Sequence, residues 1–535
     1  MYVIPLMHQF CRGEAFAPIT SQLVPSFCPQ MLRPPIPASR AKHSDRNILV
    51  ELQILSPEGF APTSLCFDPY LIANKTPNSI VMTQSQSIRA SIWAVFQNLG
   101  TLALLAIAFP INLTVVLASL LWNFFTRPFQ KQAVANPNPK NIMITGGKMT
   151  KALQLARSCH AAGHRVVLVE THKYWLVGHR FSNAVDRFYT VPAPQKDPEG
   201  YTQALLAIAK KESIDVYIPV CSPVASYYDS LAKPVLSGCC EVFHLDADET
   251  KMLDEKFAFA EKARSLGLSV PKTFLITQPE QVLNFDFSNE KNEYILKSIA
   301  YDSVHRLDMT KYPMESKEAM AVHVRSLPIS EENPWILQEF IPGKEYCTHS
   351  TVRNGELRVH CCCESSAFQV NYENVDNPRI FQWVNHFVKE LKLTGQVSFD
   401  FIEAEDGTVY AIECNPRTHS AITMFYNHPK LADAYLSDAP DPEYPLQPLP
   451  DSKPTYWLYH EVWRLTGIRS FGQLQRWVNT ILRGKDAIFS ISDPLPFLAV
   501  HHWQIPLLLL NNLQRLKGWI RIDFNIGKLV EIGGD

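Results

Sequence analysis

The hydrophobic and polar pattern changes character several times along the 535 residues of the chain. Residues 1–85 contain many prolines and no sustained periodicity, which predicts an irregular segment. Met82 opens a stretch, MTQSQSIRAS, that is typical of the start of a protein. We therefore expect translation to begin at Met82, with the preceding residues either disordered or never made.

Residues 86–130 contain an almost entirely apolar segment. No charged residue occurs from residue 92 to 125, a length able to cross a bilayer, and Arg127 follows. Because Pro110 and Asn112 interrupt the run, a kinked span and a shallow hairpin in one leaflet are both open, and a buried core helix is the alternative. We expect a membrane anchor through residues 92–125, with the basic flank and the catalytic part on the cytoplasmic side.

After a polar linker, residues 141–250 alternate buried-type strands with helical patterns. A strand at 141–145 leads into Gly146-Gly147, followed by a helical pattern and a second strand ending at Glu170. This alternation predicts a Rossmann-like α/β domain. The glycine turn lacks the spacing of a Walker or dinucleotide loop, so we expect it to face a substrate at the carboxyl end of a strand.

Residues 251–440 combine helical stretches with strands joined by hairpin turns. The stretch at 246–276 predicts a helix that carries Lys256, and Lys297 lies within an otherwise apolar strand. A lysine in such a strand needs a partner or a function, because burying an unpaired charge is costly.

The strongest local signal is a hairpin over residues 395–417. Asp406-Gly407 lies between two alternating apolar runs, which is the strongest short-range signal for a two-residue β-turn. In that case Glu405 faces Thr408, and the register of both strands is fixed.

This register places Asp400 opposite Glu413, with Asn415 on the same face of the sheet. Two carboxylates facing each other repel, so a compensating cation is expected, and Mg²⁺ accepts one or two carboxylates with waters and phosphates. Arg417 adds a planar cation suited to phosphoryl oxygens. An ordinary solvated cluster of charges is the alternative.

Composition narrows the class of protein. The formal net charge of −2 argues against a nucleic-acid binder. The 12 cysteines include no C-x-x-C pair and no paired histidine spacing that would suggest zinc. Reduced thiols of a cytosolic protein are the simplest account.

The order of these signals resembles the ATP-grasp ligases over roughly residues 141–436. By position, the resemblance implies ATP, Mg²⁺ or Mn²⁺, and ADP-forming chemistry. The segment after Lys297 lacks the glycines that many members use to cover the phosphates. The implied ATP-binding residues are Lys256, Lys297, Gln338, Glu339, Phe340, Ile341 and Glu345, the metal ligands are Asp400, Glu413 and Asn415, and the catalytic residues are Arg417 and Lys297.

Several longer stretches resemble the ATP-grasp ligases of mycosporine biosynthesis, including GGKMTKALQLAR, ECNPRTHSAITMFYNHP and RLKGWIRIDFNIGKLVEIGGD. This resemblance implies small-molecule partners, a cyclohexenone and an amino acid, joined through a C–N bond. Its candidate substrate residues are His419, Ser420 and Tyr301. Another ATP-grasp ligase and an inactive, membrane-tethered ATP-binding scaffold stay open, and a dinucleotide oxidoreductase is a distant fourth.

The tail at 451–535 predicts mainly helices, either packed on the catalytic domain or lying at a membrane interface. The expected fold class is therefore α/β and α+β. It comprises an ATP-grasp fold at 251–440 behind a Rossmann-like pre-ATP-grasp domain, an apolar membrane helix before both, and a mainly helical C-terminal extension.

Overall fold

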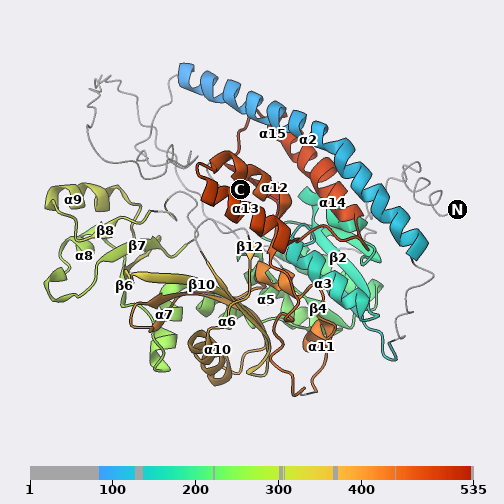
Figure 1. The fold of residues 1–535 in the computed structure, drawn as a ribbon. Helices are drawn as coiled ribbons and strands as arrows, with labels where there is room; N and C mark the ends of the chain where they lie inside the picture. Colours follow the sequence, from blue (N-terminus) through green and yellow to red (C-terminus); the bar gives the residue numbers. More distant parts are fainter. Residues whose placement is uncertain are drawn as a thin grey trace, which may run out of the picture. The chain divides into compact units, whose positions relative to one another are not determined.

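The computed structural model describes residues 84–126, 136–220, 223–300, 305, 308–365, 371–439 and 441–531 (Figure 1). The expectations for Met82 and for Tyr301 lie outside these residues.

The first domain is built around a parallel sheet with the strand order β3-β2-β1-β4-β5. Buried Val, Leu and Ile fill the central strands, as expected for a parallel sheet covered on both faces. α-Helices connect β1 to β2, β3 to β4 and β4 to β5, and two short 3-10 helices connect β2 to β3. This alternation confirms the Rossmann-like prediction. The elements are β1 (Asn141–Ile144), α3 (Thr150–Ala161), β2 (Arg165–Thr171), β3 (Arg187–Val191), α4 (Pro198–Lys211), β4 (Val216–Ile218), α5 (Pro223–Leu236) and β5 (Glu241–Val242).

Two four-stranded sheets follow, and all of their pairings are antiparallel. The smaller sheet, in the order β6-β9-β7-β8, contains β6 (Thr273–Ile276), β7 (Tyr294–Ser298), β8 (Lys311–Tyr312) and β9 (Trp335–Glu339), with α8 (Pro279–Leu283) and α9 (Lys317–Ser326) beside it. The larger sheet, in the order β11-β10-β13-β14, contains β10 (Gly343–Arg353), β11 (Glu356–Glu364), β13 (Gly395–Ala404) and β14 (Val409–Asn415), with α10 (Pro378–Glu390) inserted between β11 and β13.

The helix predicted around Lys256 is two helices, α6 (Ala247–Asp254) and α7 (Lys256–Ser265). Glu255 separates them because its carboxylate accepts hydrogen bonds from the N–H groups of Phe257 and Ala258, which caps α7. Lys256 is therefore the first residue of a new helix, and the expectation of one continuous helix is wrong.

The apolar segment forms one continuous helix, α2 (Gln84–Thr126), with Pro110 inside it. The shallow hairpin considered from the sequence is therefore wrong. Residues 91–126 are long and apolar enough to cross a membrane. Only a narrow stripe of the helix is buried, including Ala94, Asn98, Leu105, Asn112 and Val116.

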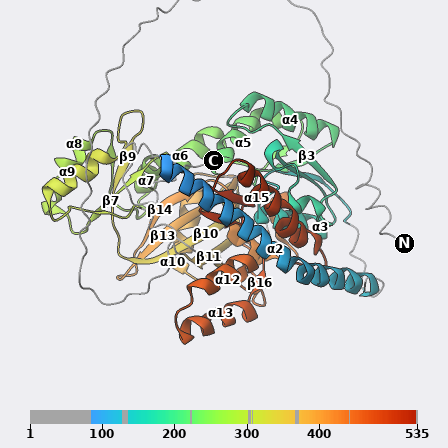
Figure 2. The ribbon, with the colours of Figure 1, turned by 90° about the horizontal axis from the view of Figure 1, so that it is seen from above.

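The C-terminal extension is mainly helical, as predicted. It contains β15 (Thr455–Tyr456), α12 (Leu458–Arg464), α13 (Phe471–Arg483), β16 (Lys485–Asp486), α14 (Leu495–Ala499), the π-helix η8 (Val500–Gln504), α15 (Ile505–Gln514) and the hairpin β17 (Arg521–Asp523) to β18 (Lys528–Val530). Helix α15 runs along α2 in both views of the molecule (Figure 1, Figure 2). β15 also pairs with β12 (Asn371–Tyr372), which ties the extension to the ATP-grasp region.

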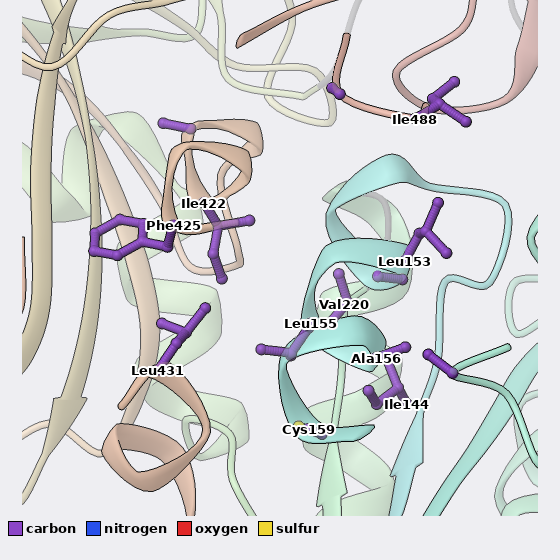
Figure 3. Close-up of a cluster of buried hydrophobic side chains, with 14 of the residues drawn as sticks. Ile144, Leu153, Leu155, Ala156, Cys159, Val220, Ile422, Phe425, Leu431 and Ile488 are labelled. Atoms are coloured by element: carbon purple, nitrogen blue, oxygen red, sulfur yellow. The ribbon is translucent and has the colours of Figure 1, made fainter. Parts of the chain in front are cut away.

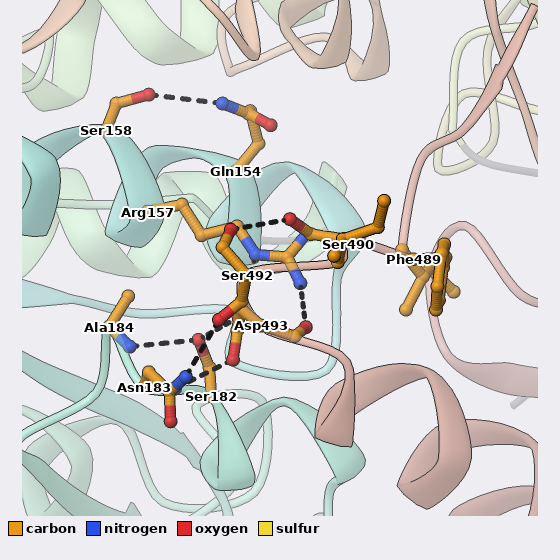
Figure 4. A network of polar contacts seen from close by, with 12 residues as sticks. Gln154, Arg157, Ser158, Ser182, Asn183, Ala184, Phe489, Ser490, Ser492 and Asp493 are labelled. Atoms are coloured by element: carbon orange, nitrogen blue, oxygen red, sulfur yellow. Dashed lines mark hydrogen bonds and ion pairs between the residues drawn. The ribbon is translucent and has the colours of Figure 1, made fainter. Parts of the chain in front are cut away.

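A polar network fastens the extension to the first domain (Figure 4). Arg157 of α3 donates to the Asp493 carboxylate at 2.8 Å and to its carbonyl at 3.0 Å. The same carboxylate accepts from the Ser182 hydroxyl and from the Asn183 N–H. Hydrogen bonds to charged groups contribute about 1.5–3 kcal/mol each, so this network is a strong point of attachment.

Helix α3 is the centre of the largest hydrophobic core (Figure 3). Leu153 and Ala156 lie on the side of α3 that faces the first domain, and Leu155 points toward Ile422. Ile422 lies in the 3-10 helix η6 (Ser420–Phe425), which directly follows the candidate site and leads to α11 (Leu431–Leu436). The first domain and the loop after β14 therefore share one core.

Candidate active site

The hairpin of β13 and β14 brings the predicted metal ligands together, although its turn differs from the prediction. The Ala404 N–H donates to the Thr408 carbonyl, and Gly407 has a φ of +78°. The loop is therefore longer than two residues, and Glu405 does not pair with Thr408. A glycine fits the turn because only glycine adopts such a φ without strain.

A β-bulge restores the predicted pairing. Next to the turn, Glu403 pairs with Val409 and Phe401 with Ala411, but Asp400 pairs with Glu413, so Ile412 is the extra residue. Without the bulge, Asp400 would face Ile412. Bulges commonly redirect a side chain beside an active site. Here the bulge places the two carboxylates opposite each other, as predicted.

Asp400, Glu413 and Asn415 form one patch. The Asn415 amide nitrogen lies 3.5 Å from an Asp400 carboxylate oxygen. Burial and the carboxylates of Glu413 and Glu345 raise the pKa of Asp400 to about 7, against the charges of Arg417 and Lys297. The patch therefore carries more negative charge than its protein surroundings stabilise.

Two lysines approach this patch from different elements. Lys256, at the N-terminus of α7, lies 3.9 Å from the Glu413 carboxylate. Lys297, on β7 of the smaller sheet, donates to the Gln338 side-chain oxygen at 3.0 Å. Burial lowers the pKa of Lys297, Glu413 opposes that shift, and Lys256 adds to it. The site therefore joins the two antiparallel sheets.

Asp254 is a site residue that the sequence analysis missed. Partial desolvation raises the pKa of its carboxyl, while Arg417 and Lys256 lower it, and Glu413 raises it further. Asp254 is the last residue of α6, directly before the cap of α7. The acidic residue two positions before Lys256 was the available signal, but the predicted single helix hid its position.

Arg417 lies on a loop that the first domain holds at both sides. The Ser226 hydroxyl donates to the Pro416 carbonyl at 2.7 Å, and the Lys151 ammonium donates to the Thr418 carbonyl at 2.5 Å. These two donors come from α5 and α3. The position of Arg417 therefore depends on the Rossmann-like domain, a link that the sequence analysis did not contain.

The segment from Gln338 to Ile341 comprises the last two residues of β9 and the two residues that follow the strand. The Glu339 N–H donates to the Lys272 carbonyl and the Phe340 N–H to the Glu293 carbonyl. The Glu339 carboxylate accepts from the Asn292 amide at 2.9 Å. Glu345 lies on β10 opposite Ile402, and its charge contributes to the raised pKa of Asp400, so it belongs to the patch electrostatically.

The two described candidate substrate residues, His419 and Ser420, follow Arg417 and contact structural partners. Burial, with the charges of Lys151 and Arg417, lowers the pKa of His419 to about 3, so its ring is neutral. The Ser420 hydroxyl accepts from the Asn525 amide at 2.7 Å. Asn525 lies in the β17–β18 hairpin, so the C-terminal extension also reaches this region.

The donor set of the patch suits a hard divalent cation. Within the residues that the structure describes, no group of three or more His, Cys, Asp and Glu side chains could hold a metal by itself. Mg²⁺ needs only one or two carboxylates, with waters and substrate phosphates completing its shell. Two carboxylates facing each other with one amide oxygen nearby fit that requirement, and a bound cation would relieve the raised pKa of Asp400.

Residues 253–421 match the family model of the ATP-grasp domain. No curated protein matches the chain. Similar solved structures include an L-amino acid ligase from Bacillus licheniformis, with 15% identity, a TM-score of 0.40 and coverage of 52% of this chain and 67% of that one. An N5-carboxyaminoimidazole synthetase from Staphylococcus aureus, in complex with ADP, has 14% identity, a TM-score of 0.43 and coverage of 60% and 82%. These scores are too low to carry an argument, so the assignment rests on the family model and the fold.

The matched residues include both lysines, the carboxylate pair, Asn415 and Arg417. Residues 253–421 therefore form an ATP-grasp domain, which indicates an ATP-dependent enzyme.

Proposed function

We propose that the protein is an ADP-forming C–N ligase. One observation carries the proposal: Lys256 and Lys297 converge on Asp400 and Glu413, the carboxylate pair that the bulge in β14 aligns. Phosphoryl transfer asks a protein mainly for positioning and for stabilisation of charge. Two ammonium groups beside a metal-type carboxylate pair supply both.

The roles of the residues follow from their places. Lys256 and Lys297 would hold ATP phosphates, and Glu345 would bind the ribose. Because the N–H groups of Glu339 and Phe340 bond within the protein, adenine would be recognised by the Glu339 carbonyl and the Ile341 N–H. The metal ligands would be Asp400, Glu413 and Asn415, for Mg²⁺ or Mn²⁺, which would draw charge from the phosphates.

Arg417 would stabilise the phosphoryl group during transfer. Its guanidinium is permanently charged and planar, so it can follow the phosphoryl oxygens without a change of protonation. The anchoring of Pro416 and Thr418 by the first domain would fix its position before the reaction. Preorganised charge of this kind costs no reorganisation at the moment of transfer.

For the acceptors we propose 4-deoxygadusol and glycine, because the longer stretches resemble mycosporine-glycine synthase. The enol oxygen of the ring would attack the γ-phosphorus, and ADP would leave. The glycine amine would then add to the phosphorylated ring carbon and expel phosphate, which forms the C–N bond. His419, Ser420 and Tyr301 are the proposed substrate residues, and the departing phosphate would take the proton that the amine loses.

One incubation tests the proposal. The purified full chain is mixed with ATP, Mg²⁺, 4-deoxygadusol and one amino acid at a time, and product mass and nucleotide are measured. We expect mycosporine-glycine and ADP with glycine only. A product from another amino acid or a carboxylate acceptor would identify a different ligase, AMP would exclude the phosphorylated intermediate, and nucleotide binding without turnover would indicate an inactive scaffold.

We also propose that the enzyme works at the cytoplasmic face of a membrane, attached through residues 92–125. The proposal is supported by the length and apolar composition of α2. Ligation consumes ATP, so the catalytic domain would face the cytoplasm.

A further inference from the structure

Helix α2 is bonded to the C-terminal extension along most of its length. The Asn98 amide donates to the Lys517 carbonyl, and the Gln97 amide donates to the Trp519 carbonyl. Asn123, near the other end, donates to the Ile491 carbonyl. From Gln97 to Asn123 the axis runs for about 39 Å at 1.5 Å per residue. This exceeds the hydrocarbon core of about 30 Å.

A third attachment lies in the middle of the helix. The Asn112 amide is 2.6 Å from the Tyr459 hydroxyl of α12 and 2.7 Å from the His502 ring of η8. If α2 spanned a bilayer, this contact would take parts of the C-terminal extension into the hydrocarbon, or it would break. Breaking it would leave the Asn112 amide without these partners in lipid, which is costly.

The opposite face of α2 is apolar and open to solvent. Exposed fractions are 70% for Trp93, 67% for Phe96, 69% for Ile107 and 68% for Phe124. The sequence from residue 92 to 126 contains no charge. Such a face extends far beyond the scattered surface residues of ordinary proteins and marks an interaction surface.

The neighbouring helix extends this apolar face. α15 lies along α2, and Leu507 and Leu510 on it are exposed by 37% and 42% (Figure 2). In the sequence, Arg89 precedes the apolar run and Arg127 follows it. Basic residues at both ends complement anionic lipid headgroups. A lipid surface fits this combination of a long uncharged face and cationic ends.

We infer that α2 lies in the plane of the membrane, in one leaflet, with its buried stripe on the protein and its exposed apolar face among the acyl chains. This inference rests on the proposed membrane attachment and specifies its geometry. A helix in this position has both ends on the side of the catalytic domain. A spanning helix would have its N-terminal end on the other side.

The first test uses the full chain with epitope tags at both termini, in sealed membrane vesicles with the cytoplasmic side outward. We expect protease to remove both tags without detergent. Protection of the N-terminal tag until detergent is added would overturn the in-plane geometry while keeping the attachment. Failure of the chain to sediment with the vesicles would overturn both, and ligase activity measured on the same sample reports separately on the proposed chemistry.

The second test changes the exposed face only. In the double variant Ile107→Glu/Ile111→Glu, we expect the fraction that sediments with vesicles of phosphatidylcholine and phosphatidylglycerol to fall at least about tenfold, because carboxylates are costly in hydrocarbon. The matched control is Val322→Glu on α9, a residue with 73% exposure outside α2. Unchanged sedimentation of the double variant would overturn the inference. It would also be overturned if vesicles bind neither protein and the unchanged chain forms a dimer without lipid that the double variant does not form.

To show that it folds, the double variant must have the same circular dichroism spectrum and the same ATP-dependent turnover as the unchanged chain. If it misfolds, the single variants Ile107→Gln and Ile111→Gln replace it, with an expected intermediate loss of sedimentation. Equal sedimentation of these single variants and the unchanged chain would count against the inference.

Discussion

Neutralising Asp400 should stabilise the metal-free protein while it removes activity. In the folded chain the pKa of Asp400 is raised from 3.8 to about 7. Between these two values the folded chain binds a proton that the unfolded chain releases. Stability therefore falls as pH rises from about 4 to about 7, and the loss is complete above that window.

The size of the effect follows from the shift. At about 1.4 kcal/mol per pKa unit, a shift of roughly three units corresponds to about 4 kcal/mol as an upper bound. Asp400→Asn keeps the shape and removes the charge, so we expect a gain of about 2 kcal/mol or more at pH 8. For a domain of about 150–250 residues, such as the ATP-grasp domain, that gain raises the Tm by about 4–8 °C. At pH 5 only about a third of this pH window has been crossed, so the difference between the two proteins should be clearly smaller than at pH 8.

The assay is thermal unfolding by circular dichroism at pH 5 and pH 8, with a chelator to remove divalent cations. Glu315→Gln, an exposed carboxylate before α9, is the control and should leave the Tm unchanged at both pH values. An equal change in the Tm of Asp400→Asn at both pH values, or a loss at pH 8, would refute the electrostatic reasoning. Added Mg²⁺ with ATP should stabilise the unchanged chain more than the variant, because only the former keeps both carboxylates.

Four further outcomes can be measured. Glu413→Ala should abolish ADP release in a coupled assay, whereas Glu405→Gln in the exposed turn should not, and turnover in the Glu413 variant would exclude the metal role. Arg417→Ala should lower kcat by about 100-fold with little change in KM for ATP, and the reverse pattern would exclude a role in the transition state. Lys256→Met should raise KM for ATP by about tenfold, equivalent to about 1.4 kcal/mol, and an unchanged KM would place the phosphates elsewhere. Trp383→Ala removes a ring that stacks on Phe387, with 5.2 Å between the ring centroids, in the core of the ATP-grasp domain. It should lower the free energy of unfolding in urea by about 3–5 kcal/mol, and a smaller loss would indicate that the core repacks.

The register of the active-site hairpin shows how much of the structure the local sequence pattern can predict. The prediction that Asp400 faces Glu413 is confirmed, although the reason given for it is incomplete. The loop is longer than a two-residue turn, and the extra residue Ile412 in β14 restores the pairing. A bulge leaves no mark in an alternating pattern, because it depends on how the two strands meet rather than on either strand alone.

The remaining differences concern contacts between distant segments. Periodicity predicts the parallel sheet and the apolar helix, since each depends on local side-chain spacing. It does not predict that Lys151 and Ser226 hold the loop around Arg417, or that Asn525 reaches Ser420. Such contacts depend on the packing of whole domains. Asn112 was expected only to interrupt the apolar run, and it is one of the attachment points of the helix, as is Asn98.

The hairpin of β17 and β18 also limits how early the site can be completed during synthesis of the chain. The Thr150 N–H at the start of α3 donates to the Asn525 carbonyl, and the Thr150 hydroxyl bonds to the Phe524 carbonyl 374 residues later. At about 5–20 residues per second, the ribosome makes these partners about 20–75 s after α3. Throughout that interval the N-terminus of α3 lacks this bond, and Ser420 at the start of η6 lacks its bond from Asn525. A nascent chain that already contains both antiparallel sheets therefore still lacks these contacts. They form only after the ribosome has made the β17–β18 hairpin.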